Sequence, residues 1–396
     1  MLILSKPLVV PVQPMSAPEI AISVTTYQKP WHLRRALASI AGQQGIAGRF
    51  EVVVTDDGST DETPEIVEQF RRGVDFPVHF TTHPRAAFQV SKCRNSGARA
   101  TTAPYLLFVD GDCVLPPDHV ATHLAHRGPG RAILGDCYRI EREISETLSE
   151  EGARRGEFLA WHVNGERQRH ARQHRKAQFY SLLRHARKPK LVGNNFAVWR
   201  SDFERVNGFD ENFCGWGQED DDLGLRLRRA GIRLQSILRW TRSYHLWHPR
   251  DPTMTKSWRE GTNVPYFLRR SRLTRCRNGI VKRRVDDLAI EITGSGDAAR
   301  RVNEMLRQHG IQTAENGSRS RSSGVQPEVE IMALPGAARF STAAEFRLLI
   351  LLDEAQPHRK LLEQANMIVS AAPLAGLNGD PQFALADFPQ ALDAIA

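Results

Sequence analysis

The chain has 396 residues, 41% of them hydrophobic, and a formal charge of +9 at pH 7. This length favours two domains over one, and the charge favours an anionic partner such as a phospholipid or a diphosphate compound. The five cysteines form no Cys-x-x-Cys pair and no even framework, which argues against a zinc ribbon or a disulfide scaffold. The basic residues accompany no nucleic-acid-binding signature, so we expect no nucleic-acid partner.

Residues 1–18 are expected to form a loose leader. Pro7, Pro11 and Pro14 interrupt the apolar residues there, leaving no sustained hydrophobic segment and no small-residue cleavage site. Together with the scattered cysteines, this predicts a cytoplasmic protein.

The next part of the chain alternates between strand and helix patterns. Apolar runs predict strands, and apolar positions at helical spacing predict the helices between them. This alternation predicts an α/β fold with a doubly wound, mostly parallel sheet and a ligand beyond the carboxyl ends of its strands. The strands are expected at 21–26, 51–55, 78–81, 105–109 and 131–135, and helices are expected to start at Pro30, to contain Ile66, Val67 and Phe70, and to cover 90–100.

The pattern then becomes a long, charged helical excursion at 141–190, followed by a strand or strand pair at 191–199. A short helix should begin among the acids Glu219–Asp222, because apolar residues recur at helical spacing after them and Gly231 suits the position after a helix. An edge strand is expected at 232–238 and a turn at 244–249.

Residues 286–396 are expected to form a second, small α/β unit, after a main domain at 19–285. Strand patterns at 288–292, 329–333, 346–352 and 367–370 accompany a helical pattern at 298–309 and a polar loop at 315–324.

Three acidic pairs stand where strand or helix ends would bring them together: Asp56 and Asp57, Asp110 and Asp112, and Glu219 and Asp220. For Glu219 and Asp220, at the expected start of a helix, capping and the helix dipole offer an alternative explanation that involves no chemistry. The Trp216 ring beside the third pair offers a flat surface on which a sugar could stack.

Asp110-Gly111-Asp112 follows an apolar strand and presents hard oxygen ligands, which suit Mg²⁺ or Mn²⁺. His245 and His248 are candidates for a third metal ligand. The alternative for either histidine is packing against Trp247 or exposure to solvent.

The positive charge is concentrated in two tracts, 167–190 and 269–284, and the first holds nine Lys/Arg and no Asp/Glu. Solvated helix faces explain such runs, and so does peripheral contact with an anionic membrane, which attracts basic clusters.

Five motifs taken together resemble glycosyltransferase family 2, the inverting nucleotide-sugar transferases of GT-A fold, over 21–249. The last of them is similar to a run in β-1,4-galactosyltransferases and chondroitin-synthase-type polymerases, although Gln218 stands where the galactosyltransferases have glycine. The motifs are Val-Thr-Thr-Tyr (24–27), Thr-Asp-Asp-Gly-Ser-Thr-Asp (55–61), Arg-Asn-Ser-Gly (94–97), Asp-Gly-Asp (110–112) and Gly-Trp-Gly-Gln-Glu-Asp-Asp-Asp (215–222).

This resemblance implies a metal-dependent transfer of sugar from a nucleotide-diphosphate sugar, with a UDP-sugar as first candidate, to a glycan, polysaccharide or lipid-linked acceptor. Mn²⁺ or Mg²⁺ would be the cofactor. The implied roles are the nucleobase border for Thr26 and Tyr27, base or ribose binding for Asp56 or Asp57, nucleotide binding for Arg94, ribose and donor-sugar contact for Asp110, metal binding for Asp112 with His245 or His248, general base for Asp220, hydroxyl binding for Glu219, and sugar contact for Trp216.

Chemistry supports this division of roles independently. Displacement at an anomeric carbon needs a base for the attacking hydroxyl, and the leaving diphosphate needs charge stabilisation, which a metal ion supplies. Two other functions stay open: a sugar-phosphate nucleotidyltransferase, and a noncatalytic binder of anionic membrane or polymer. Against the nucleotidyltransferase, the sequence near the N-terminus has no glycine-rich nucleotide-binding loop with a basic residue.

Overall fold

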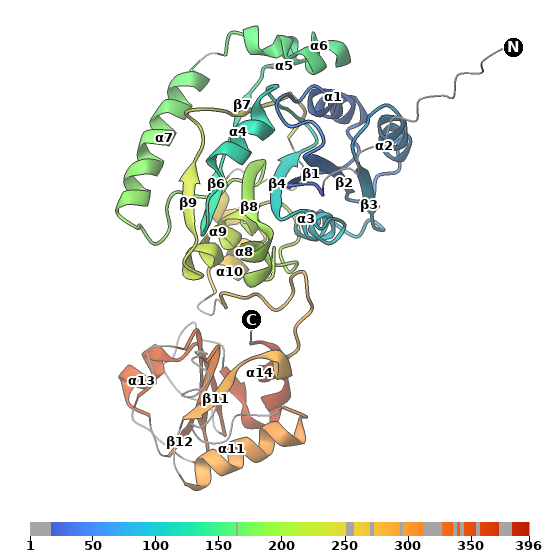
Figure 1. Ribbon diagram of the computed structural model, residues 1–396. Helices are drawn as coiled ribbons and strands as arrows, with labels where there is room; N and C mark the ends of the chain where they lie inside the picture. The colour runs from blue at the N-terminus through green and yellow to red at the C-terminus, as the bar shows by residue number, and fades with distance from the viewer. Residues whose placement is uncertain are drawn as a thin grey trace, which may run out of the picture.

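The computed structural model describes residues 17–163, 165–250, 257–269, 273–293, 296–311, 327–335, 339–340, 344–353, 357–371 and 382–395 (Figure 1). The expected polar loop at 315–324 lies outside these residues, as does the expected leader apart from Ala17 and Pro18.

The main sheet has seven strands in the order β3-β2-β1-β4-β8-β6-β9. Strand β8 runs antiparallel to both of its neighbours, and every other pairing in the sheet is parallel. The predicted mostly parallel sheet is therefore confirmed, with β9 at its edge. The strands are β1 (Ile20–Thr26), β2 (Phe50–Asp56), β3 (Val78–Thr82), β4 (Tyr105–Asp110), β6 (Arg131–Leu134), β8 (Asn195–Trp199) and β9 (Arg233–Ser236).

Helices cover both faces of this sheet because alternate residues of each strand point to opposite sides. In β1, Ile20, Ile22 and Val24 pack with residues of α1 and α2, whereas Ala21 packs on the other face with residues of α9. The helices of this part are α1 (Pro30–Ala41), α2 (Thr63–Arg72), α3 (Val90–Arg99), α4 (His119–His126), α8 (Arg200–Arg205), α9 (Glu219–Arg229) and α10 (Val264–Phe267).

A second, three-stranded sheet has the order β5-β10-β7. Its strands are β5 (Cys113–Val114), β7 (Cys137–Arg139) and β10 (Ser243–His245). The prediction of a turn at 244–249 was therefore wrong for its first two residues, Tyr244 and His245, which belong to β10 and pair on both sides with short strands. Three residues carry too little periodicity to identify a strand from sequence.

The predicted helical excursion at 141–190 is broken into separate pieces. Gly156 and Gly165 have φ angles of 76° and 71°, and each lies at a point where one helix ends or another begins. The strand predicted at 191–199 is also shorter, since β8 begins only at Asn195. The pieces are α5 (Arg142–Ser145), α6 (Glu150–Arg155), a 3-10 turn (Glu157–Ala160) and α7 (Glu166–Leu182).

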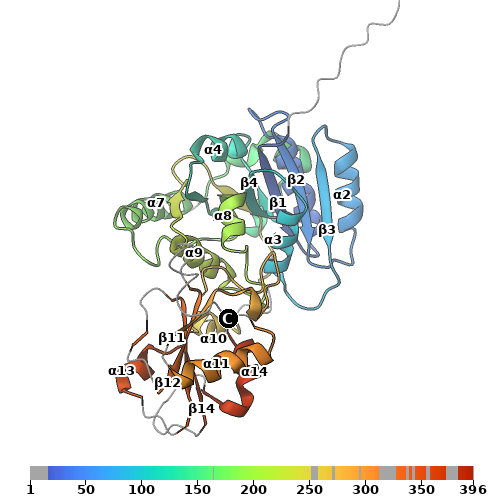
Figure 2. The same ribbon diagram turned by 60° about the horizontal axis from the view of Figure 1, so that its bottom comes forward.

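The C-terminal part holds a five-stranded, all-parallel sheet in the order β11-β12-β13-β14-β15. Figure 2 shows this sheet beyond α10, with the C-terminus between it and the main sheet. Near the C-terminus, Arg277 Nη1 donates to the carbonyl oxygens of Asp393 and Ile395. Leu273 and Val285 belong to its core, and the boundary at 285/286 stays a prediction. The elements are β11 (Ile290–Thr293), α11 (Asp297–Gln308), β12 (Val329–Leu334), β13 (Phe346–Leu351), α13 (Arg359–Gln364), β14 (Met367–Ser370), β15 (Gln382–Ala384) and α14 (Phe388–Asp393).

Candidate active site

Three strands of the main sheet end at the same edge. The register pairs Thr26 with Asp56 across β1 and β2, and Thr25 with Asp110 across β1 and β4. The acids that follow β2 and β4 therefore share the carboxyl edge of the sheet, where ligands bind in open α/β folds.

Backbone pairing brings His245 to Asp112. His245 is opposite Cys113 in the β5-β10 ladder, and the amide of Leu246 donates to the Asp112 carbonyl oxygen at 2.9 Å. The short strand β10 thus fixes a histidine beside an acid more than a hundred residues earlier in the chain.

Asp112, His245 and His248 form a group with ligand atoms within 4.8 Å of one another. The Nε2 atoms of His245 and His248 lie 3.5 and 3.1 Å from the Asp112 carboxylate. Burial opposes ionisation of Asp112, but His245 and Lys29 outweigh it and hold the pKa of this carboxyl well below its usual range. One carboxylate and two imidazoles are a donor set that fits a divalent transition-metal ion such as Mn²⁺.

Lys29 already supplies a positive charge to this group. Its Nζ lies 2.8 Å from Asp112 Oδ2 and 2.9 Å from His248 Nε2. The ammonium group of Lys29 therefore occupies the same Asp112 carboxylate and His248 nitrogen that a metal ion would need.

Arg94 joins two acids at the same edge. Its guanidinium donates to Asp110 Oδ1 and to Glu219 Oε1, each at 3.2 Å, and its side chain is only 4% exposed. A Cβ atom at Gly193 would lie 2.6 Å from the guanidinium, so glycine is needed there for Arg94 to fit. Asp110 is two residues from Asp112. Arg94 therefore connects the start of α9 to the group of Asp112, His245 and His248, which we call the metal-type group.

The turn before α9 sets the direction of its first residues. Gln218 has a left-handed φ of 71°, and Gly217 before it has a φ of 95°. Glycine adopts this conformation at no steric cost, whereas a residue with a side chain, such as Gln218, adopts it only rarely. Trp216, in the same turn, is 36% exposed.

Asp220 is the second residue of α9, and its surroundings favour the neutral form of its carboxyl group. Desolvation is the largest cause and the nearby charges of Glu219 and Asp221 add to it, so that the pKa of Asp220 rises to about 7 despite the opposing Arg94. Two main-chain amides, of Gly193 and Asp221, donate to its carboxylate at 3.1 and 2.7 Å. Burial also raises the pKa of Glu219, against the effect of Arg94.

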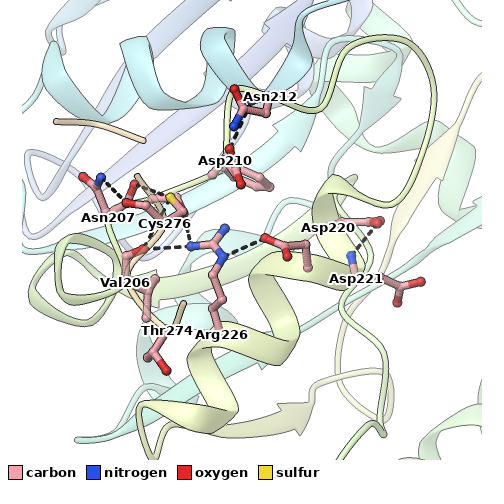
Figure 3. Close-up of polar contacts among 12 residues, drawn as sticks. Val206, Asn207, Asp210, Asn212, Asp220, Asp221, Arg226, Thr274 and Cys276 are labelled. Atoms are coloured by element: carbon pink, nitrogen blue, oxygen red, sulfur yellow. Dashed lines mark hydrogen bonds and ion pairs between the residues drawn. The ribbon is translucent and has the colours of Figure 1, made fainter. Parts of the chain in front are cut away.

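The other two acids of α9 anchor the helix. Arg226 Nε donates to Asp222 at 2.6 Å, and its Nη1 donates to the carbonyl oxygen of Val206 at 2.8 Å. Figure 3 shows the contact between Arg226 and Val206. Asp221 instead pairs with Lys190 at 2.5 Å. Of the four acids, Glu219 and Asp220 thus belong to the site, and Asp221 and Asp222 hold the helix in place.

Asp56 and Asp57 follow β2 and have partners of their own. Asp56 accepts hydrogen bonds from the Ser59 amide and the Thr82 hydroxyl, at 2.9 and 2.7 Å. Asp57 pairs with Arg85, whose guanidinium carbon lies 3.8 Å from the centre of the Tyr27 ring. Burial raises the pKa of Asp57.

The structure brings most of the predicted site residues to this edge, in two connected sets and one neighbouring set. Asp112, His245 and His248 form the first set, Asp110, Arg94, Glu219 and Asp220 the second, and Tyr27, Asp56 and Asp57 the third. Thr26 is buried at the end of β1, where its hydroxyl has no hydrogen-bond partner among the described residues, and Trp216 lies in the turn before α9.

Sequence reasoning missed four residues of the site. Lys29 contacts the metal-type group, and His83, Arg85 and Cys93 surround Asp57, with His83 Nε2 3.3 Å from Asp57 and 3.4 Å from Cys93 Sγ. Lys29, His83 and Arg85 follow the carboxyl ends of β1 and β3, and that position is the signal that could have identified them.

The family comparisons agree with this geometry. Residues 21–190 match the model of glycosyl transferase family 2, and residues 173–249 match that of the N-terminal domain of galactosyltransferase. The resemblance carried by the motifs is thereby confirmed, and the mostly parallel sheet confirms the α/β fold class.

Curated relatives include validoxylamine A glucosyltransferase from Streptomyces hygroscopicus subsp. jinggangensis, 33% identical over 232 residues that cover 54% of this chain and 52% of the relative. Chondroitin synthase from Escherichia coli is 26% identical over 282 residues, 63% of this chain and 39% of the synthase. The chain thus spans about half the length, or less, of these two relatives. Among solved structures, mannosyltransferase PcManGT from Pyrobaculum calidifontis, in complex with GDP-Man and Mn²⁺, has a TM-score of 0.40 at 22% identity and 58% coverage of each chain.

Proposed function

We propose that this chain, which matches glycosyl transferase family 2 over residues 21–190 and the N-terminal domain of galactosyltransferase over residues 173–249, is a metal-dependent, inverting glycosyltransferase. It would move a sugar from a nucleotide-diphosphate sugar, with a UDP-sugar as first candidate, to a hydroxyl of a glycan, polysaccharide or lipid-linked acceptor. The main support for this proposal is the pair of ion pairs that Arg94 forms with Glu219 and Asp110. They join the start of α9 to the end of β4, which directly precedes the metal-type group.

Asp220 would be the general base. A carboxylate with a pKa of about 7 is half ionised near neutral pH and accepts a proton more readily than an ordinary aspartate. The hydroxyl proton would pass to Asp220 as the acceptor oxygen bonds to the anomeric carbon. The bond from that carbon to the diphosphate oxygen breaks on the opposite face, which inverts the configuration.

Asp112, His245 and His248 would hold the metal ion. When bound, such an ion neutralises the negative charge that develops on the leaving diphosphate. Lys29, on the same group, would stand close enough to help hold the phosphates.

The remaining site residues would bind the donor. Tyr27 and Arg85 stack on each other beside Asp57, which supports a nucleobase site bordered by Thr26 and Tyr27, with Asp56 or Asp57 as the hydrogen-bonding acid. Arg94 would act on the nucleotide through Asp110, which it orients toward the ribose and donor sugar. Glu219 would hold a hydroxyl, and Trp216, with part of its ring exposed, would face the sugar.

We also propose peripheral contact with the cytoplasmic face of an anionic membrane through 167–190. Three apolar side chains near the end of α7, Phe179, Leu182 and Leu183, are 58%, 81% and 59% exposed within this basic tract. No helix in the part of the chain that the structure describes is long and apolar enough to cross a membrane. Flotation with anionic vesicles at low salt tests this contact, and a protein that stays in the soluble fraction contradicts it.

The test of the enzymatic proposal is a screen of UDP-, GDP- and dTDP-sugars with Mn²⁺, read out as release of nucleoside diphosphate. Metal-dependent release with one donor, and a product of inverted anomeric configuration by NMR, are expected. A protein that binds vesicles or polyanions but no nucleoside diphosphate with Mn²⁺ would instead be a noncatalytic binder.

A further inference from the structure

A hollow of about 650 Å³ lies between α7 and the edge of the main sheet at β9. Figure 1 shows α7 running alongside β9 at this edge, where His174 Nδ1 lies 3.1 Å from Ser236 Oγ. Leu134, Val192 and Leu238 give the hollow an apolar part. Its volume is in the range of pockets that take small ligands.

The hollow adjoins the proposed general base. Lys190 and Val192 line it, and both belong to the segment that ends at Gly193, whose amide donates to Asp220 at 3.1 Å. Lys190 Nζ also lies 2.5 Å from Asp221 Oδ2. A molecule bound in the hollow therefore lies next to the start of α9.

The lining is strongly basic. Arg169, Arg172, Lys176, Lys188 and Lys190 line the hollow, and no acidic residue does. Arg169 is held by Glu166 and Asp136, and Lys190 by Asp221.

Three of these cations, Arg172, Lys176 and Lys188, form no ion pair with any residue that the structure describes. Arg172 and Lys176 are exposed on α7, four residues apart and thus on the same face of the helix. Tyr180, one turn further, places an aromatic ring in the lining, with Lys188 Nζ 5.0 Å from its centre. Lys188 thus already contacts an aromatic ring, whereas Arg172 and Lys176 are held by neither an acid nor a ring among the described residues, and the hollow combines these cations with apolar and aromatic surface.

We infer that this hollow is the acceptor subsite and that the acceptor carries a negatively charged group, a phosphate or a carboxylate, which Arg172 and Lys176 bind. This inference rests on the proposed function. The apolar surface would contact the face of a sugar ring or the first carbons of a lipid, and the receiving hydroxyl would point toward Asp220.

The test uses matched pairs of probes that differ only in charge, with UDP and Mn²⁺ present. 4-Nitrophenyl β-glucuronide against 4-nitrophenyl β-glucoside reports on a carboxylate, and dodecyl phosphate against dodecanol reports on a lipid phosphate. Binding is measured by saturation-transfer NMR. We expect the charged member of at least one pair to bind about fivefold or more tightly than its neutral partner, and the preferred pair identifies the source of the anion.

The variants are Arg172→Gln combined with Lys176→Gln, and Arg175→Gln as the control. Arg175 is an exposed cation on the same helix that does not line the hollow. The double variant should lose the preference for charge, and the control should keep it. Equal binding of charged and neutral probes, or a preference that survives in the double variant, overturns the inference.

Binding of UDP, GDP and dTDP with Mn²⁺, followed by calorimetry in the same samples, separates the two proposals. If the unaltered protein binds one of these nucleotides with Mn²⁺ and shows no charge preference, only the acceptor inference fails. If it binds no nucleoside diphosphate at all, the proposed function fails.

Discussion

Lys29 and Asp112 form an ion pair of 2.8 Å across 83 residues of sequence. The lysine follows the end of β1 and the aspartate follows the end of β4, two neighbouring strands of the sheet. Its ammonium group therefore competes with any metal ion for the same carboxylate.

Replacing Lys29 by Gln should tighten the binding of Mn²⁺ alone by roughly tenfold, because it removes a like charge from the metal-type group. Water-proton relaxation during Mn²⁺ titration measures this. Lys360→Gln, at an exposed lysine in the C-terminal part, is the control and should leave the affinity unchanged. Weaker Mn²⁺ binding in Lys29→Gln would mean that the lysine supports the ion instead of competing with it.

The rate of sugar transfer should depend on pH through Asp220. Because burial and neighbouring acids raise its pKa to about 7, the fraction in the ionised, basic form falls as the pH drops below that value. The value of kcat/KM should therefore decrease by about tenfold per pH unit well below pH 7 and level off above it. A profile that is flat from pH 5 to pH 8 would contradict the assignment of Asp220 as base.

Arg94→Met should destabilise the fold strongly. It would leave Asp110 and Glu219 without their shared cation, in a place where Arg94 itself is 4% exposed. Removing one partner of a buried ion pair costs about 3–5 kcal/mol of unfolding free energy. Urea unfolding measures the cost, and Arg99→Met, at an exposed residue of the same helix, should cost less than about 1 kcal/mol.

Arg226→Met should loosen α9 from its support without removing a group of the site. Arg226 is 2% exposed, and it bonds Asp222 and the carbonyl oxygens of Val206 and Gly208. We expect a loss of about 3 kcal/mol or more in unfolding free energy. Combining it with Asp222→Asn should cost much less than the sum of the two single changes, since the residues interact directly. Additive effects would show that the pair does not act as a unit.

Much of the site could be predicted because the apolar runs of β2 and β4 are unambiguous. Acids come directly after each run, and neighbouring parallel strands place the residues after their carboxyl ends at one edge of the sheet. The start of α9 was equally readable, because Leu223 and Leu227 mark one face of a helix directly after the acids.

The partners of those acids were harder to predict. That Arg94 bridges Asp110 and Glu219 depends on how α3 packs against α9, and no local pattern reports it. His245 was identified as a ligand candidate, yet the strand that places it, β10, is only three residues long. Such contacts are set by tertiary packing, which overrides the local sequence signal.

We propose that Asp112 and Asp220 act in one site on different steps, and two variants test this directly. With the donor found in the screen, Asp220→Asn should keep metal-dependent binding of the nucleotide sugar while transfer falls by about 10²–10⁴-fold. Asp112→Ala should lose the metal-dependent binding itself. Calorimetry and initial rates on the same preparations give both quantities, with Asp75→Asn, at an exposed acid, as the control. Transfer that survives both substitutions, or binding that Asp112→Ala leaves intact, would contradict the account.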